Sequence, residues 1–208
     1  MPVASLREQH AELTRERILS AVAELLERDG AGELTVPDVA AASGVSLRTV
    51  YRYYPTREKL LEAAGRWIGD ELFKHPYPRN LDEAAERFRV ECAHFDDRPG
   101  LVRALALSEL GREARSYRRR GRVGAIRKAL HEEAGALPAD ELRRAEAVLA
   151  YLHNMLAYTT MREENGLSGA EIGEAVGWAI KTLVADLRRR DKSQRRKDER
   201  ASDRQRAG

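Results

Sequence analysis

The chain has 208 residues, a formal net charge of +3 and a single cysteine, Cys92. A chain of this length can bury a substantial core in one or two small domains. One cysteine excludes an internal disulfide and is typical of the reducing cytoplasm, where we expect this protein to be. The start of the chain is polar and resembles no signal peptide, and no apolar run approaches the roughly 18–20 residues of a membrane span, so we expect a soluble protein without membrane contact.

The first strong helical pattern covers residues 12–28. Its aliphatic side chains recur at helical spacing and comprise Ile18, Leu19, Val22, Leu25 and Leu26. Gly30 and Gly32 end this pattern, and the residues before about His10 are expected to form a loose arm. The predicted helix supplies an apolar face on which the next two helices can pack.

A capped pair of short helices follows. Thr35 is a good N-cap and Gly44 can adopt the left-handed turn that ends a helix, which predicts a helix from about Val36 to Ser43. Ser46 then caps a second helix that Pro55 must end. Two short helices joined by a tight turn containing glycine form a helix-turn-helix, whose second helix enters the major groove of DNA.

The second short helix has distinct faces. Val50 and Tyr54, with Leu47 near the same face, can seat it on the core, while Arg48 and Arg52 are turned outward. Arginine can pair with guanine, and hydroxyl groups can bind phosphates. Cations in the first turn of the following helix, capped by Thr56, indicate an external anion there. The predicted DNA contacts are Thr35, Ser46, Leu47, Arg48, Thr49, Tyr51, Arg52, Tyr53, Arg57 and Lys59. The alternatives are a solvated surface for the arginines and partial core burial for the tyrosines.

The run LTVPDVAAASGVSLRTVYRYYPTREKLL, residues 34–61, resembles the DNA-binding segment of the TetR family of bacterial transcriptional regulators. The residues that carry the resemblance are Gly44, Thr49, Tyr51, Tyr53, Pro55 and Leu60. The family usually has Phe at the position of Tyr54 and Lys at that of Arg57, and both replacements keep the chemistry. The resemblance implies an all-helical homodimer that controls genes and releases DNA when a small molecule enters its larger C-terminal domain.

The rest of the chain is also predicted to be helical, which gives an all-α fold class. The turn-rich stretch 75–80 separates an N-terminal three-helix DNA-binding domain with a linking fourth helix, residues 1–75, from a helical ligand-binding and dimerisation domain, residues 80–190. Helices are predicted from Asn80, after Pro99, over 109–134 as one helix or a helix pair, and over 140–164, and a capping box of Ser168 and Glu171 begins the last one. The charged tail, residues 191–208, is predicted to be disordered.

The last two helices are long and apolar. Two such helices from each of two chains would form a four-helix bundle and a homodimer; the alternative is that both belong to the core of one subunit. A small-molecule site between helices is predicted to use Phe88, Cys92, Phe95, Tyr151, Met155 and Tyr158, although each is also an ordinary core residue. The basic run 112–122 is interpreted as a solvated helix surface, with a second nucleic-acid patch as the alternative.

Enzyme motifs are missing from the sequence. The five histidines have no partner at metal-ligand spacing, and no phosphate-binding glycine loop occurs. We therefore predict no catalytic residue, no metal and no cofactor. The function predicted is a ligand-responsive regulator, a repressor released from a palindromic double-stranded DNA operator by a small-molecule effector. The alternative is a helical protein–protein interaction module that keeps the helix-turn-helix as a structural element.

Overall fold

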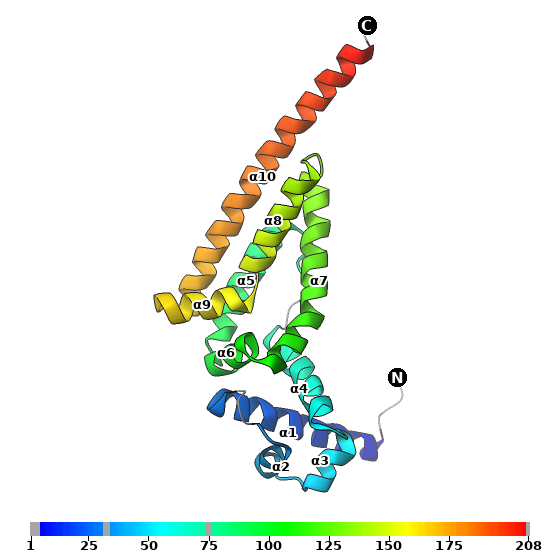
Figure 1. Cartoon of the computed structure of the whole chain (residues 1–208), viewed down its shortest axis with the longest axis vertical. Helices are drawn as coiled ribbons and strands as arrows, with labels where there is room; N and C mark the ends of the chain where they lie inside the picture. Colours follow the sequence, from blue (N-terminus) through cyan, green and yellow to red (C-terminus); the bar gives the residue numbers. More distant parts are fainter. Residues whose placement is uncertain (1–4, 31–33, 74–75, 207–208) are drawn as a thin grey trace. The chain divides into compact units, whose positions relative to one another are not determined.

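The computed structural model describes residues 5–30, 34–73 and 76–206, and these residues form ten α-helices and no strand (Figure 1). The predicted all-α fold is confirmed. The chain divides into an N-terminal unit, Met1–Lys74 with Asp97–Arg118, and a C-terminal unit, His75–Asp96 with Arg119–Gly208. The predicted boundary near residues 75–80 lies close to the first of these divisions. It did not anticipate that residues 97–118 return to the N-terminal unit.

The N-terminal unit is built on α1 (Leu6–Asp29), which contacts α2 (Val36–Ser43), α4 (Arg57–Leu72) and α6 (Pro99–Leu107). α3 (Leu47–Tyr53) packs on α2. The core of this unit contains the buried side chains Ile18, Val22, Leu26, Val39, Val50, Leu60 and Ile68. Burial of each such side chain stabilises the fold by roughly 1.5–3 kcal/mol relative to exposure.

Two features of α1 and α6 differ from the sequence prediction. α1 begins at Leu6, because Ser5 caps it and Glu8 completes a capping box, so the predicted loose arm is shorter than expected. α6 joins the N-terminal unit because Arg98 donates from Nε to Glu27 Oε2 at 2.7 Å, and because Gly100 lies close to the Glu27 carbonyl. A Cβ on Gly100 would stand 2.8 Å from that oxygen, so the contact requires a residue without a side chain.

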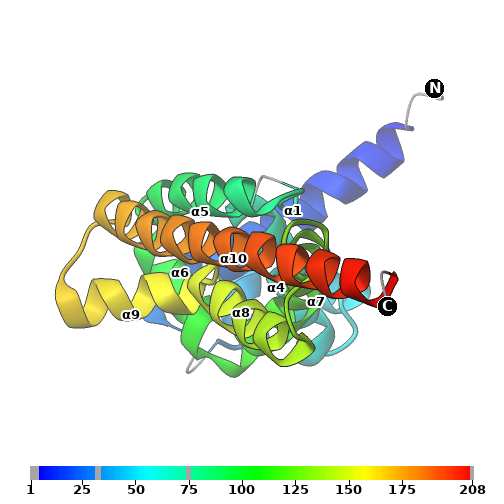
Figure 2. The ribbon, with the colours of Figure 1, turned by 90° about the horizontal axis from the view of Figure 1, so that it is seen from above.

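The C-terminal unit contains α5 (Leu81–Phe95), α8 (Ala139–Leu152), α9 (Met155–Asn165), α10 (Gly169–Arg206) and the later part of α7 (Glu109–Ala134). α5 runs alongside α10, as Figure 2 shows, and α10 also contacts α8 and α9. The helix predicted over 140–164 is two helices. Asn154 interrupts it and caps α9 by accepting a hydrogen bond from the Leu156 amide at 3.2 Å.

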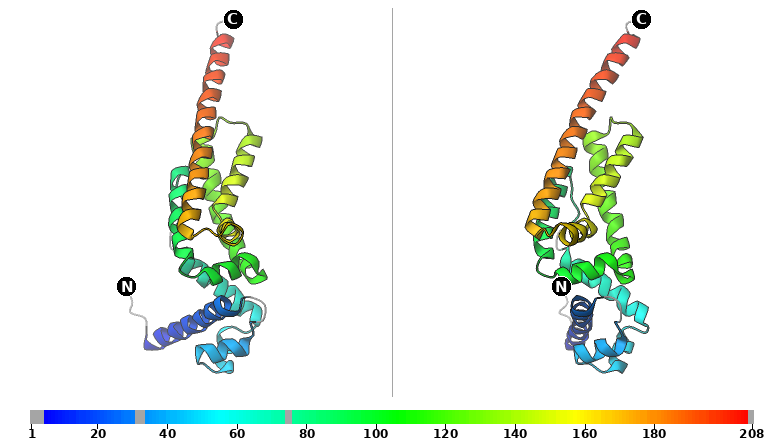
Figure 3. Two further views of the ribbon diagram at one scale, coloured as in Figure 1. Left: turned by 90° about the vertical axis from the view of Figure 1, so that its left-hand side faces the viewer. Right: turned by 60° about the vertical axis from the view of Figure 1, so that its left-hand side comes forward.

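The predicted disorder of the charged tail is wrong for residues 191–206, which continue α10 to Arg206 (Figure 3). No glycine or proline interrupts this stretch. Pairs one turn apart support the helix: Arg195 binds Asp191 at 2.7 Å and Gln194 donates to Asp198 at 2.9 Å. The prediction failed because low hydrophobicity was taken as disorder, although this segment extends a helix already nucleated by packing.

Among the described helices, none combines the length and the apolar character that crossing a membrane requires.

Candidate nucleic-acid interface

The turn between α2 and α3 is held by local and tertiary hydrogen bonds. Gly44 has φ 67° and ψ 25°, the left-handed conformation predicted for the end of α2. Thr35 caps the start of α2, where its hydroxyl oxygen accepts from the Asp38 amide and also donates to the Asp38 carboxylate. From α1, Arg17 Nη2 donates to the Ser43 carbonyl at 2.8 Å. This bond ties the end of α2 to the supporting helix.

α3 is anchored through its middle and its C-terminal end. Val50 is fully buried, and Tyr54, the C-cap residue, is nearly so. Ser46 caps the start of the helix by accepting from the Thr49 amide at 3.2 Å, and the two hydroxyl oxygens lie 2.8 Å apart. Leu47 is 42% exposed, so its predicted place on the inward face is wrong. Leu47 lies before the anchoring residues Val50 and Tyr54 and belongs to the outer surface of α3. It is also one of the predicted DNA contacts.

The outer surface of α3 presents the predicted set of side chains. Arg48, Tyr51 and Arg52 are exposed, and Thr49 and Tyr53 are half-buried. Within the described residues, Arg48 has no hydrogen bond or ion pair that would compete with a DNA base. Tyr53 is flanked by two guanidinium groups, with Arg15 and Arg52 5.5 Å and 5.2 Å from its ring centroid. These cation–π contacts orient the Tyr53 hydroxyl and restrain Arg52.

The start of α4 flanks this surface. Thr56 caps α4 and accepts from the Lys59 amide at 3.2 Å. Arg57 donates from Nε to the Leu34 carbonyl at 3.0 Å, so part of its hydrogen-bonding capacity already stabilises the N-terminal unit. Lys59 forms an exposed ion pair with Glu62 at 2.9 Å. Exposed pairs of this kind are worth about 0–1 kcal/mol, so a phosphate can compete for Lys59.

Two arginines of α1 were missed by the sequence prediction. Arg17 positions the end of α2, and Arg15 lies over Tyr53. Their positions on the helix were visible in the sequence, but only the packing of α1 against the helix-turn-helix shows what they contact.

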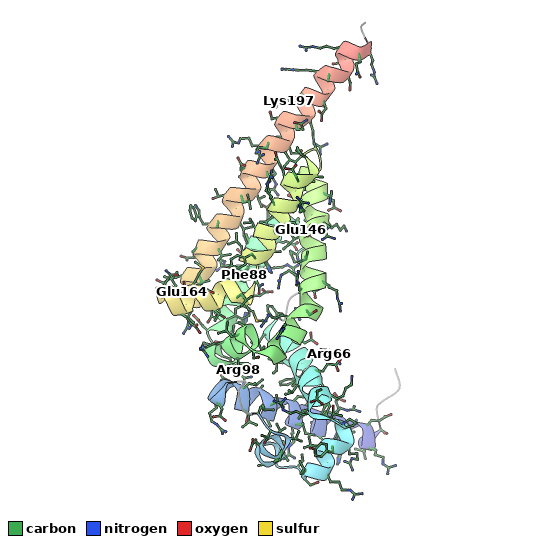
Figure 4. All side chains as sticks on the ribbon, in the orientation of Figure 1. Arg66, Phe88, Arg98, Glu146, Glu164 and Lys197 are labelled. Atoms are coloured by element: carbon green, nitrogen blue, oxygen red, sulfur yellow. The ribbon has the colours of Figure 1, made fainter. Side chains whose placement is uncertain are left out.

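Five of the six predicted ligand contacts are buried together in the C-terminal unit: Phe88, Cys92, Phe95, Met155 and Tyr158. Phe88, labelled in Figure 4, lies on α5, and Phe95 and Tyr158 stack edge to face with ring centroids 5.1 Å apart. Tyr151 is 56% exposed on α8 and does not join them. Tyr151 lies outside the cluster because the residue that enters the core at the end of α8 is His153.

His153 is the unexpected member of this cluster. It is buried against Phe88 with ring centroids 5.2 Å apart, and its Nε2 has no hydrogen-bond partner among the residues that the structure describes. Burial, with a smaller contribution from Arg122, lowers the pKa of His153 to about 4. Burial also raises the pKa of the Cys92 thiol, which makes Cys92 a poor nucleophile. No group of His, Cys, Asp or Glu suited to a metal occurs in the described part of the chain.

Comparison with known proteins indicates the class of protein. Residues 18–64 match the family model of bacterial regulatory proteins, tetR family, a range that contains α2, α3 and their turn. The nucleoid occlusion factor SlmA of Aliivibrio fischeri is 32% identical over 98 residues, which are 44% of this chain and 50% of that protein. The chain therefore spans about half the length of the curated relatives it matches.

Solved structures share the fold at low sequence identity. A tetR-family transcriptional regulator from Streptomyces coelicolor is 18% identical with a TM-score of 0.64, over 86% of this chain and 91% of that one. The regulator FadR of Bacillus subtilis, solved with stearoyl-CoA, is 16% identical with a TM-score of 0.60, over 81% and 97%. The protein is thus an all-helical protein with an N-terminal helix-turn-helix. Its residues 18–64 form the DNA-binding domain of bacterial regulatory proteins of the tetR family.

Proposed function

We propose that the protein is a dimeric repressor that binds a palindromic operator through α3 and leaves it when a small molecule binds the C-terminal unit. The observation that carries this proposal is the surface of α3. Arg48 is exposed and has no competing partner among the described residues. It lies beside the hydroxyl groups of Ser46 and Thr49, which are hydrogen-bonded to each other at the start of α3. This combination suits a guanine edge and neighbouring phosphates.

A two-fold dimer would supply the second half of the contact. One short recognition helix makes few contacts, whereas two related helices meet half-sites about 34–36 Å apart or a multiple of that distance. The C-terminal unit exposes large apolar side chains on the two helices that would pair: Trp178 on α10 is 72% exposed, and Val148 and Tyr151 lie exposed on α8. Tyr151 therefore fits the proposed dimer surface better than the proposed ligand site.

The effector site is proposed around the buried cluster of Phe88, Cys92, Met155, Tyr158 and His153, whose Nε2 has no partner among the described residues. A mostly apolar set of side chains with few polar groups favours a largely apolar ligand with one hydrogen-bonding group that His153 can bind. FadR supports a ligand-binding role for this fold, because its structure contains stearoyl-CoA. Release follows if the ligand binds the DNA-free conformation more tightly, since a ligand shifts an equilibrium only by its differential affinity.

The test is selection of duplexes from a random pool by the full chain. The proposal predicts enrichment of one inverted repeat, and loss of that enrichment when Arg48 and Arg52 are both changed to Ala. The rival function, an interaction module that does not use the motif on DNA, predicts no enriched sequence and no effect of the Arg48 and Arg52 replacements on duplex binding. That result would reject the regulator.

The effector is tested separately with the selected duplex. Candidate metabolites are added to the protein–duplex complex, and the protein is compared with a His153→Leu variant. The proposal predicts that at least one apolar metabolite releases the wild-type protein and releases the variant less well. If every metabolite that releases DNA acts equally on both proteins, His153 does not bind the ligand.

A further inference from the structure

α10 extends well past the core that supports it. Its last buried residue is Asp191, and the helix continues to Arg206 (Figure 3). We call residues 192–206 the α10 extension. At 1.5 Å per residue it is about 22 Å long. Its single hydrophobic residue is Ala201, so it offers neither a coiled-coil seam nor an apolar face for a membrane surface.

Cations outnumber acids on this helix: residues 192–206 contain seven Lys and Arg against three acids, Asp198, Glu199 and Asp203. A groove of about 730 Å³ follows its root and is lined by Arg188, Arg189, Lys192, Arg196, Lys197 and Arg200, with no carboxylate in the lining. Lys197, labelled in Figure 4, lies on the part of α10 that extends past α8. Of the nearby acids, Asp191 and Asp198 bind Arg195 and Gln194, and Glu199 and Asp203 are exposed but do not line the groove.

The cations at the root are paired, and further along Arg195 is paired with Asp191. Arg188 binds Asp82 at 2.9 Å and also binds Glu133, and Arg189 binds Asp186. In the described part of the chain, Lys192, Arg196 and Arg200 have no ion-pair partner, and all three are exposed. Their charge is therefore available to a partner.

The spacing of these cations works against the free helix. Arg188, Lys192, Arg196, Arg200 and Arg204 follow one another at intervals of four residues, so each lies one turn from the next. Like charges at this spacing destabilise a helix. A linear polyanion along the row would replace this repulsion with attraction. Duplex DNA provides such a partner, with one negative charge per about 1.7 Å of helix axis.

We propose that the α10 extension is a second DNA contact, which binds duplex phosphates without regard to sequence. It lies outside the helix-turn-helix and does not depend on the reading of an operator by α3. Its effect is to raise the affinity for any duplex and to steepen the salt dependence of binding.

The experiment measures binding of the full chain to a random-sequence duplex at several salt concentrations. The test variant replaces Lys192, Arg196 and Arg200 with Gln, which has a helix propensity similar to that of Lys and Arg. The matched control removes the same charge from the same unit by replacing Lys128, Arg143 and Arg144 with Gln. Circular dichroism checks that both variants keep their helix content.

The proposal predicts that the slope of log affinity against log salt becomes shallower by about 2.7 in the test variant, or about 0.9 for each phosphate that is no longer neutralised. The control keeps the wild-type slope. Equal changes in both variants would show a net-charge effect and overturn the proposal, as would an unchanged slope in the test variant. An Arg48→Ala protein tested on the same duplex separates α3 from the extension, because a weakening confined to Arg48→Ala would support α3 and reject the extension.

Trypsin cleavage gives an independent readout. The random duplex should slow cleavage within residues 192–206 of the wild-type protein, whereas vesicles of phosphatidylglycerol should not. Protection by the vesicles and not by the duplex would assign the extension to an anionic membrane surface and overturn the proposal.

Discussion

At the scale of single residues, Gly44 sets the direction in which α3 leaves α2. Its φ of 67° lies in the left-handed region, where a side chain is strained, and a Cβ there would stand 3.0 Å from Arg17 Nη2. That nitrogen is the one that holds the Ser43 carbonyl. A side chain at Gly44 would thus disturb both the turn and its attachment to α1.

Gly44→Val should lower the free energy of unfolding by about 1–3 kcal/mol, measured by chemical denaturation. Gly124→Ala is the control, because no heavy atom lies within 4 Å of a Cβ there and φ is not positive. Alanine in mid-helix should raise the free energy of unfolding by about 0.5–1 kcal/mol. A Gly44→Val protein as stable as the wild type would contradict the left-handed turn.

His153 makes stability depend on pH. Its pKa of about 4 in the folded protein lies below the value of about 6.5 for an unfolded chain, so the unfolded state binds a proton more readily. As pH falls from 7 to 5, His153 should therefore remove about 2 kcal/mol from the free energy of unfolding. The carboxylates whose pKa values are lowered, such as Glu83, act mostly at lower pH.

Denaturation of wild-type and His153→Leu proteins at pH 7 and pH 5 tests this dependence. Leucine cannot titrate, so the variant should lose less stability over this interval, and the difference between the two proteins isolates His153. Identical losses would show that His153 is solvated or hydrogen-bonded in the folded protein.

At the scale of the elements, Asp96 joins three helices of the C-terminal unit. It follows α5 and accepts hydrogen bonds from the Tyr158 hydroxyl at 2.7 Å, from Arg162 Nη1 at 2.5 Å and from the Gly169 amide at 2.6 Å. The last bond satisfies an otherwise unpaired amide at the start of α10. A Cβ on Gly169 would clash with the Cys92 carbonyl oxygen, so the helices meet closely here.

Asp96→Ala should lower the free energy of unfolding by about 2–3 kcal/mol, because it leaves the buried Tyr158 hydroxyl and Arg162 without their acceptor. Asp97→Ala is the neighbouring control. Asp97 is exposed, so its replacement should change stability by less than about 0.5 kcal/mol. Equal effects of the two replacements, measured by urea denaturation, would remove Asp96 from its joining role.

Elements with local start and stop signals were predictable from the sequence. Thr35, Ser46, Thr56 and Asn80 all cap the helices they were expected to cap, because an N-cap acts on amides two or three residues away. The Ser168–Glu171 capping box is also present. The α3 surface was predictable for the same reason, since its caps and anchors lie within about ten residues.

Features that depend on tertiary contacts were not predictable. The break at Asn154 was missed because buried residues continue through His153, so periodicity alone indicates one helix. The packing of α6 on α1 depends on contacts such as that of Arg98 with Glu27. These residues are 71 positions apart, and the sequence has no local signal for such a contact. Arg17 was missed as a support of the recognition turn for the same reason.

At the scale of the whole molecule, the net charge of +3 says little about nucleic acid, and the placement of charge says more. Among the described residues, unpaired cations occur on the surface of α3 and along the α10 extension, whereas many others are neutralised by carboxylates one turn away. Each of the two proposed DNA contacts can therefore be tested by its own charge-removing variant. The proposed dimer can be tested by a separate variant, because its surface uses apolar rather than charged side chains.

Trp178→Glu should convert the proposed dimer to a monomer, because it would place a charge in the proposed apolar interface. Sedimentation at micromolar concentration measures the change. Leu13→Glu is the control, since Leu13 is also exposed but lies on α1. A Trp178→Glu protein that remains dimeric would move the interface away from this part of α10.

The central claim is that the outer surface of α3 reads a DNA sequence. The most direct measurement compares the affinities of wild-type, Arg48→Ala and Arg143→Ala proteins for the selected duplex and for a scrambled duplex at one fixed salt concentration. We predict that Arg48→Ala weakens binding to the selected duplex by about 1–3 kcal/mol more than binding to the scrambled one, and that Arg143→Ala changes neither. Equal losses on both duplexes, or no loss on either, would contradict the claim.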